Sequence, residues 1–284
     1  MTRFLKTLLC AGLLMAGVRG ALGFALHGPV NEAWQVPTIG YNLPWYVDIG
    51  APKNFADEYR RNVPIMFYSF DPEFEDYFGV HGMEAVDRAF AILNSLADVS
   101  SYSNDLSEFP LSTKATNFRA SVLGLMDMKS ITLSLMMEQL GLAEPDRYTW
   151  NIRNRFVGPG GCPNDVDYLI VMRNYAIQPT ALDTLMYSPY VNGAMLTYFI
   201  DEDCNVAPND LDPAAEAWEV VTDPINDRYT AVASFQVNTI DLGALYTGLT
   251  RDDVAGLRYL MRFGNVNLES LGTNSLMLRT NATS

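Results

Sequence analysis

The residues best placed to do chemistry lie in one apolar stretch, Ser130 to Pro145. It carries Ser134, Glu138 and Glu144, with Gly141 between the two acids. Two carboxylates can act as acid and base when burial separates their pKa values. Glu138 and Glu144 are therefore candidates for a metal-independent hydrolase. A solvated position for both acids is the plainer interpretation, and we prefer it.

The scarcity of histidine limits other mechanisms. The chain contains two histidines, His27 and His81. Ser134 as a nucleophile needs a base, and His81 is the one available, although nothing local places it near Ser134. We expect His81 to be a residue of a loop or of a helix start.

The elements that must position these residues follow from hydrophobic spacing. The apolar stretch predicts a helix that begins after the N-cap Asp127 and ends at Gly141, because glycine can take the left-handed conformation. A second amphipathic helix is predicted at 82–98, and Thr250 caps a closing helix that stops at Gly264. Strand-like runs are predicted at 64–70, 167–175, 193–200 and 229–237.

Taken in order, these elements resemble the matrixin-type metzincin zinc proteases. Four segments carry the resemblance: 64–96, the helix of the apolar stretch, Thr184 to Tyr190 and 249–264. In the third, Met186 is similar to the methionine of the turn below the metal. The resemblance implies an α/β (α+β) fold with a twisted mixed sheet, two long packed helices and a C-terminal helix.

The residues of the family's zinc motif are missing. Aligned with H-E-x-x-H-x-x-G-x-x-H through Gly141, the ligand positions hold Ser134, Glu138 and Glu144, and the general-base position holds Leu135. Zinc in such a site needs three imidazoles, a water and a carboxylate beside that water. We therefore exclude zinc peptidase activity by the family mechanism, and we expect no metal and no cofactor. The helix is predicted to keep only its packing role.

The start of the chain predicts export. Residues 1–23 have basic Arg3 and Lys6, an apolar run at 8–18 and small residues before a cleavage site near Gly23, with Ala25 as a second choice. These features are typical of a signal peptide. No later run is long and uncharged enough to span a bilayer, so we expect a secreted or cell-surface protein without a membrane span in the mature chain.

The number of cysteines and the net charge indicate the compartment and limit the classes of partner. Loss of the leader leaves Cys162 and Cys204, which predict one disulfide in an oxidising compartment. The net charge is −14, from 33 acids against 19 bases, without a basic patch. Nucleic acid and anionic membranes are therefore not expected partners. The acidic loop 201–212 offers oxygen ligands for calcium, but we prefer a solvated loop tied down by Cys204.

The expected organisation is a signal peptide at 1–23, an extended N-terminal lead-in at 24–62, a metzincin-like domain with inserted strands and loops at 63–264, and a polar tail at 265–284. The lead-in carries four aromatic residues that could stack on a sugar or anchor a partner, although we expect them to be buried: Trp34, Tyr41, Trp45 and Tyr46. We expect an exported pseudoprotease that binds an unidentified protein or glycan partner. The alternatives are the hydrolase using Glu138 and Glu144, and a self-assembling subunit of an extracellular structure.

Overall fold

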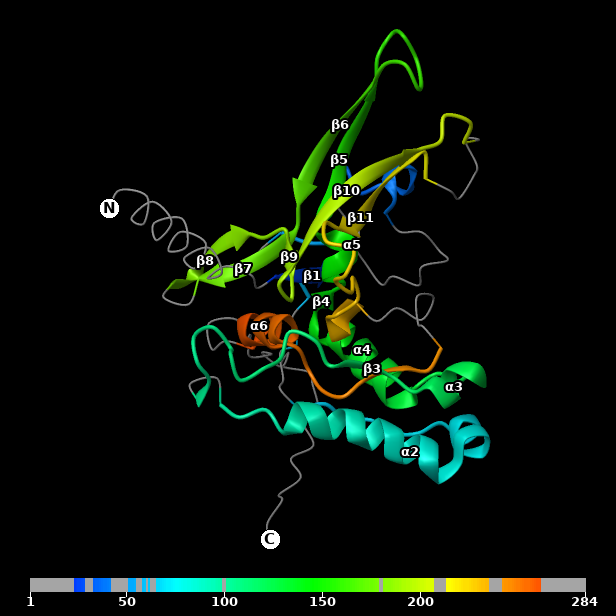
Figure 1. The fold of residues 1–284 in the computed structure, drawn as a ribbon, viewed down its shortest axis with the longest axis vertical. Coiled ribbons are helices and arrows are strands. Elements are labelled where there is room, and N and C mark those ends of the chain that lie inside the picture. The colour runs from blue at the N-terminus through cyan, green and yellow to red at the C-terminus, as the bar shows by residue number, and fades with distance from the viewer. Residues whose placement is uncertain are drawn as a thin grey trace, which may run out of the picture.

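The fold is described from a computed structural model (Figure 1). The described residues are 23–28, 33–41, 51–54, 58–59, 61, 65–98, 101–178, 181–206, 213–234 and 242–261. Residues before Gly23, the aromatic residues Trp45 and Tyr46, and the predicted polar tail lie outside them. Helices and antiparallel strands are both present, so the predicted α+β class is confirmed.

Strand β1 (Phe24–Gly28) lies at the centre of the largest sheet, and all five of its residues are buried. It pairs with the three strands β2 (Ala51–Pro52), β4 (Leu142–Ala143) and β7 (Asn174–Gln178), and β7 continues the sheet to β8 (Ala181–Tyr187). The expectation of a surface lead-in from residue 24 is therefore wrong for β1. Its continuous apolar run is typical of a strand that is covered on both faces.

The remaining strands form three smaller sheets. These are β9 (Tyr190–Val191) with β10 (Ala194–Glu202) and β11 (Ala215–Val221), β5 (Trp150–Val157) with β6 (Val166–Met172), and β3 (Lys114–Thr116) with β12 (Ala244–Tyr246). Every strand pair among the described residues is antiparallel. The predicted mixed sheet is wrong, because short hairpin connections such as those of β5–β6 and β7–β8 permit only antiparallel pairing.

Two long helices pack against each other as predicted. Helix α2 (Pro72–Asn94) contacts α4 (Met128–Leu140). Helix α2 begins earlier than expected, because Asp71 accepts a hydrogen bond from Glu73 N at 2.8 Å and the chain continues through a kink at Gly79. Residues 65–70 form no strand, so that part of the prediction is wrong.

Three further strand predictions have different outcomes. The run 193–200 matches β10. The run 167–175 is divided at Arg173 into β6 and β7. The run 229–237 is wrong in its described part, where the short 3₁₀ helix η3 (Val232–Ser234) forms instead.

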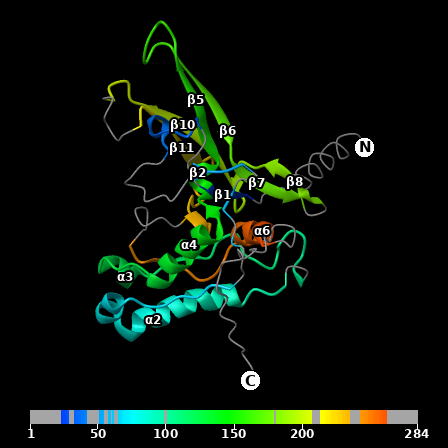
Figure 2. The same ribbon diagram turned by 180° about the vertical axis from the view of Figure 1, so that it is seen from behind.

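The long helices α2 and α4 lie in the lower half of the molecule in Figure 1, and the hairpins β5–β6 and β10–β11 extend above them; Figure 2 shows the same arrangement from behind. The main core is built by β1, α4 and the closing helix α6 (Arg251–Leu260). A second apolar cluster lies in the upper half, around Ile39, Tyr41 and Ile152. Among the described residues, no helix has the length and apolar character needed to cross a membrane.

Candidate functional site

Helix α4 has the predicted ends. The Asp127 carboxylate accepts hydrogen bonds from Ser130 N at 2.9 Å and Ser130 Oγ at 2.6 Å, which caps the first turn. The helix stops at Gly141, whose φ is +106°. A Cβ atom at Gly141 would lie 2.3 Å from the carbonyl oxygen of Tyr59, so only glycine fits here.

The four residues that the resemblance aligns with zinc-ligand and general-base positions are divided between the interior and the surface. Ser134 and Glu144 are buried, each 3% exposed, Glu138 is half-buried and Leu135 is 47% exposed. Glu144 is the N-cap residue of the short helix α5 (Pro145–Tyr148), where its backbone oxygen accepts from Tyr148 N at 3.0 Å. The solvated position preferred for both acids is therefore wrong for Glu144.

The two histidines lie in α2 and β1, outside α4. His81 lies within α2, and its side chain is 97% exposed beside Glu84, at 3.6 Å. A fully exposed imidazole cannot act as the base for Ser134, which is buried, so that candidate pairing is wrong. His27 lies in the buried strand β1.

Met186 does not lie in a turn. It belongs to β8, pairs with Ala176 of β7 and is 48% exposed. The assignment of this residue to a methionine turn is therefore wrong. One of the segments that pack against α4 is η3, which belongs to a different part of the sequence.

Asp253 of α6 holds η3 in place. Its carboxylate accepts from Val232 N and Ala233 N, both at 3.0 Å, and from Thr250 N at 2.8 Å and Thr250 Oγ1 at 2.5 Å. Thr250 is the N-cap residue of the closing helix, as predicted, and it forms a capping box with Asp253. The two bonds to η3 were not predicted, because they join residues about twenty positions apart.

A buried cluster of one arginine and two carboxyls lies between the helical and the strand-rich halves. Arg228 Nε is 3.6 Å from Asp146 Oδ2, and Arg228 Nη2 is 3.8 Å from Glu219 Oε2. Glu219 also accepts from Trp150 N at 3.2 Å. Burial raises the pKa of Asp146, and it raises the pKa of Glu219 well above its ordinary range, although Arg228 opposes both shifts. The sequence offered no signal for this group, because its members are far apart in the chain.

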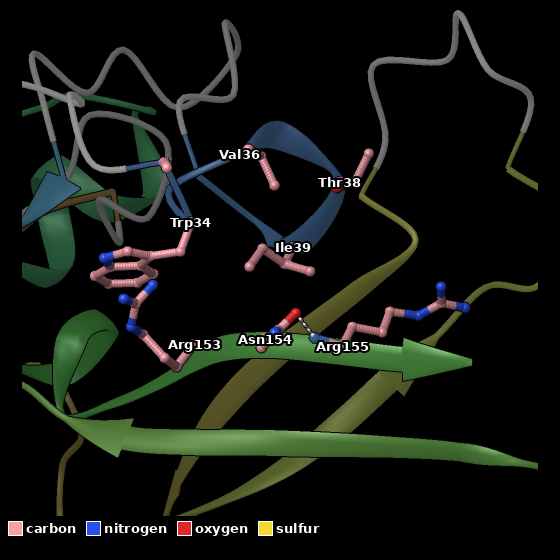
Figure 3. A pocket seen from close by; sticks show the side chains of 8 residues that line it. Trp34, Val36, Thr38, Ile39, Arg153, Asn154 and Arg155 are labelled. Carbon is pink, nitrogen blue, oxygen red and sulfur yellow. Dashed lines mark hydrogen bonds between the residues drawn. The ribbon is translucent and has the colours of Figure 1, made fainter. Parts of the chain in front are cut away.

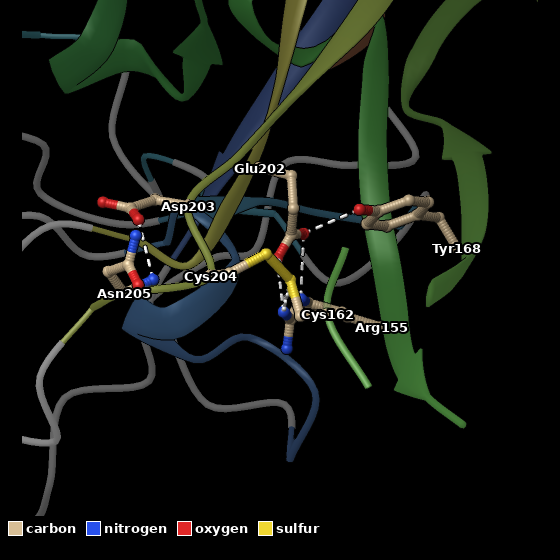
Figure 4. Close-up of a disulfide and its surroundings, with 7 residues drawn as sticks. All are labelled: Arg155, Cys162, Tyr168, Glu202, Asp203, Cys204 and Asn205. Atoms are coloured by element: carbon tan, nitrogen blue, oxygen red, sulfur yellow. Dashed lines mark hydrogen bonds and ion pairs between the residues drawn. A yellow bond between two sulfur atoms is a disulfide. The ribbon is translucent and has the colours of Figure 1, made fainter. Parts of the chain in front are cut away.

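The predicted disulfide is present. Cys162 and Cys204 are joined with a Cα–Cα distance of 5.6 Å, which ties the β5–β6 hairpin to the end of β10 (Figure 4). Beside it, Glu202 accepts from Arg155 Nε at 3.0 Å and from the Tyr168 hydroxyl at 2.6 Å. Burial would raise the pKa of Glu202, but the bonds from Arg155 and Tyr168 lower it below its ordinary value.

Metal ligation has little support in the described part of the chain. One group of three side chains there lies close enough to share an ion, namely Cys162, Glu202 and Cys204. The disulfide uses both sulfur atoms, and Arg155 neutralises Glu202. The calcium hypothesis for the loop 201–212 falls partly outside the described residues, since 207–212 are not among them.

A pocket of about 460 Å³ lies between η1 (Pro37–Ile39) and β5 (Figure 3). The Arg153 guanidinium lies over the Trp34 ring, 4.1 Å from its centre. Val36 and Ile39 point into the space from the opposite side, and the Arg155 side chain extends away from Trp34. The pocket combines an apolar wall with one cation stacked on an aromatic ring.

The aromatic residues of this region have the predicted burial only in part. Tyr41 is buried, donates its hydroxyl to the Ile152 carbonyl at 3.0 Å and meets Trp34 edge to face at 5.2 Å. Trp34 itself is half-buried and contributes to the pocket. The aromatic residues of the lead-in were the sequence feature that pointed to this site. The stacking of Arg153 on Trp34 could not be predicted, because it depends on tertiary contacts.

Comparison of the chain with protein-family models, with curated proteins and with solved structures gives no match.

Proposed function

We propose that the chain is an exported, non-catalytic binding protein on a metzincin-like framework that has lost its zinc chemistry. The observation that carries the proposal is the character of α4. This helix keeps an N-cap, a buried face and a glycine stop. The residues at its ligand and base positions are Ser134, Leu135, Glu138 and, after the stop, Glu144.

The donor set does not suit a catalytic zinc ion. Zinc in proteins is bound by imidazole, thiolate or carboxylate, and a neutral serine hydroxyl is a poor substitute. Leucine at the base position cannot accept the proton of a metal-bound water. The exposed side chain of Leu135 and the buried side chain of Ser134 also face different environments.

The contacts around α4 support the framework part of the proposal. Helix α4 packs on η3, and Asp253 of α6 binds the backbone of η3. The segment that the closing helix holds against α4 is Val232 to Ser234, and not the run Thr184 to Tyr190 that the resemblance assigned to the methionine turn.

The exposed apolar residues near α3 (Phe118–Val122) support a binding role. Phe118 is 79% exposed, Val122 is 88% exposed and Leu123 is 60% exposed. Exposed apolar side chains that lie together on a protein surface often mark a site of contact with a partner.

A zinc graft tests the proposal. The full chain, including the predicted leader, is expressed in a host that can secrete it. Zinc content and casein hydrolysis are then measured on the purified protein. Two variants follow: Ser134→His with Glu138→His, and the same pair with Glu144→His. Two histidines four residues apart can bind zinc on any helix. Tighter zinc binding by the triple variant than by the double variant is expected only if position 144 converges on α4.

The outcomes separate the parts of the proposal. Stoichiometric zinc in the unmodified protein, or hydrolysis that disappears in Glu138→Gln, would overturn the non-catalytic role. Equal zinc affinity of the folded double and triple variants would overturn the metzincin-like framework. Retention of the leader in the intact mass of secreted material would overturn export by signal cleavage.

A further inference from the structure

The pocket between η1 and β5 concentrates positive charge in an acidic protein. The chain has a net charge of −14. Arg153 lines the pocket, and the described residues place no carboxylate within ion-pair distance of its guanidinium. Arg155 also lines the pocket, but Glu202 neutralises it and its side chain extends away. Arg153 is therefore the cation that a ligand in this space would meet.

A second cation lies behind the Trp34 ring. The guanidinium of Arg173 is 5.8 Å from the centre of the ring, and the residue is only 9% exposed. One of its N–H groups donates to the Met172 carbonyl at 3.1 Å, and its Nε has no hydrogen-bond partner among the described residues. Its guanidinium adds to the positive potential at the pocket.

The acids near this region oppose that potential only weakly. Glu216 approaches Gly40, and Glu219 lies farther inside, beside Arg228. Burial raises the pKa of both carboxyls, which favours their neutral forms.

The orientation of Arg153 determines which ligand group it can bind. Because its flat face lies on Trp34, its N–H edge is left for acceptors in the plane of the guanidinium. Carboxylates and sulfates match that edge with two parallel hydrogen bonds. The wall formed by Val36 and Ile39 suits the carbon face of a small ring, and Thr38 and Asn154 add polar atoms at the rim.

We propose that this pocket binds a small saccharide that carries a carboxylate or a sulfate. The anionic group lies on Arg153, and the sugar ring lies against Val36 and Ile39. The pocket volume of about 460 Å³ falls within the usual range of ~300–1,000 Å³ for small-molecule sites. This site gives the proposed binding role a location and a ligand class, so it rests on the proposed function.

The test uses a pair of ligands that differ only in charge. The purified protein, expressed from the full chain, is titrated with glucuronate and with glucuronamide at fixed ionic strength. Binding is followed by calorimetry and by tryptophan fluorescence. Glucuronate is expected to bind at least about 10-fold more tightly than the amide, because the amide removes one charge-assisted contact. Galactose 6-sulfate is titrated in parallel to test the sulfate arm.

Three variants locate the binding. Arg153→Gln is expected to weaken glucuronate binding by about 10-fold or more. Val36→Glu, at a position that is 37% exposed, is expected to weaken it by repulsion without disturbing the core. Arg119→Gln, on exposed α3, is the matched loss of one positive charge away from the pocket, and it is expected to change the affinity by less than about twofold. Circular dichroism checks that each variant is folded.

The proposal is overturned if neither anionic sugar binds, if glucuronamide binds as tightly as glucuronate, or if the folded Arg153→Gln variant binds as tightly as the unmodified protein. Zinc content and peptidase activity are measured on the same preparation. A protein that binds glucuronate but also carries catalytic zinc would overturn the proposed function alone. A protein without zinc or peptidase activity that binds neither sugar would overturn this inference alone.

Discussion

Replacement of Gly141 by alanine should destabilise the protein strongly, for two separable reasons. The φ of +106° is costly for a residue with a Cβ atom, by about 1–2 kcal/mol. The new Cβ would also lie 2.3 Å from the Tyr59 carbonyl oxygen, which requires the backbone to move. Overpacking of this kind costs about 1–3 kcal/mol. The expected loss in the free energy of unfolding is therefore about 2–5 kcal/mol.

Tyr59 cannot move away without breaking other contacts. Its backbone N–H donates to the His27 carbonyl at 2.7 Å, and His27 N donates to the Gly141 carbonyl at 2.8 Å. A shift of Tyr59 would thus disturb β1, the buried strand at the centre of the main sheet. This coupling places the expected cost toward the upper part of the range.

Two other glycines separate the backbone cost from the steric cost. Gly124 has a φ of +68° and open space where a Cβ would lie, so Gly124→Ala should cost about 1 kcal/mol. Gly248 has open space and no positive φ, so Gly248→Ala should be neutral or slightly stabilising. Urea unfolding followed by circular dichroism measures all three variants. If Gly141→Ala costs no more than Gly124→Ala, the close approach of Tyr59 to the helix end is refuted.

The remaining predictions concern buried carboxylates. Asp253→Asn keeps the shape of the side chain but turns an N–H donor toward the backbone N–H groups of η3, so a loss of about 1–3 kcal/mol is expected in urea unfolding. Asp223→Asn on an exposed turn is the control, and equal losses in both variants would contradict the role given to Asp253. Because burial raises the pKa of Glu219 well above its ordinary value in the folded state, folding binds a proton there, and stability should fall as the pH rises above the ordinary titration range of a glutamate. Glu219→Gln should make that decline shallower, and a decline as steep as in the unmodified protein would argue against this assignment.

Helix α4 and its ends could be predicted because their signals are local. Asp127 caps a turn three residues away, and Gly141 stops the helix through its own backbone conformation. The capping box at Thr250 has the same local character. The disulfide could be predicted for a different reason: only Cys162 and Cys204 remained once the predicted leader was set aside.

The sequence predictions were wrong where a short apolar run is compatible with more than one kind of local structure. Residues 24–28 were assigned to a surface segment, because a short run does not show that other strands pair with both of its edges. The region around Met186 was assigned to a turn by resemblance, although it is a strand paired with β7. The run 229–237 contains strand-forming residues, but Asp253 binds the backbone of Val232 and Ala233 and holds it as η3.

The sequence by itself determined the helix ends, whose causes lie within a few residues, and also the lack of histidine between Ser130 and Pro145 and the cysteine pair. It also determined the acidic balance that argues against nucleic acid. Only the tertiary structure decided that Arg153 stacks on Trp34, that Arg228 lies between Asp146 and Glu219, and that η3 lies beneath α4. These contacts join residues far apart in the chain, and their energies depend on burial and mutual orientation, which exist only after the chain has folded.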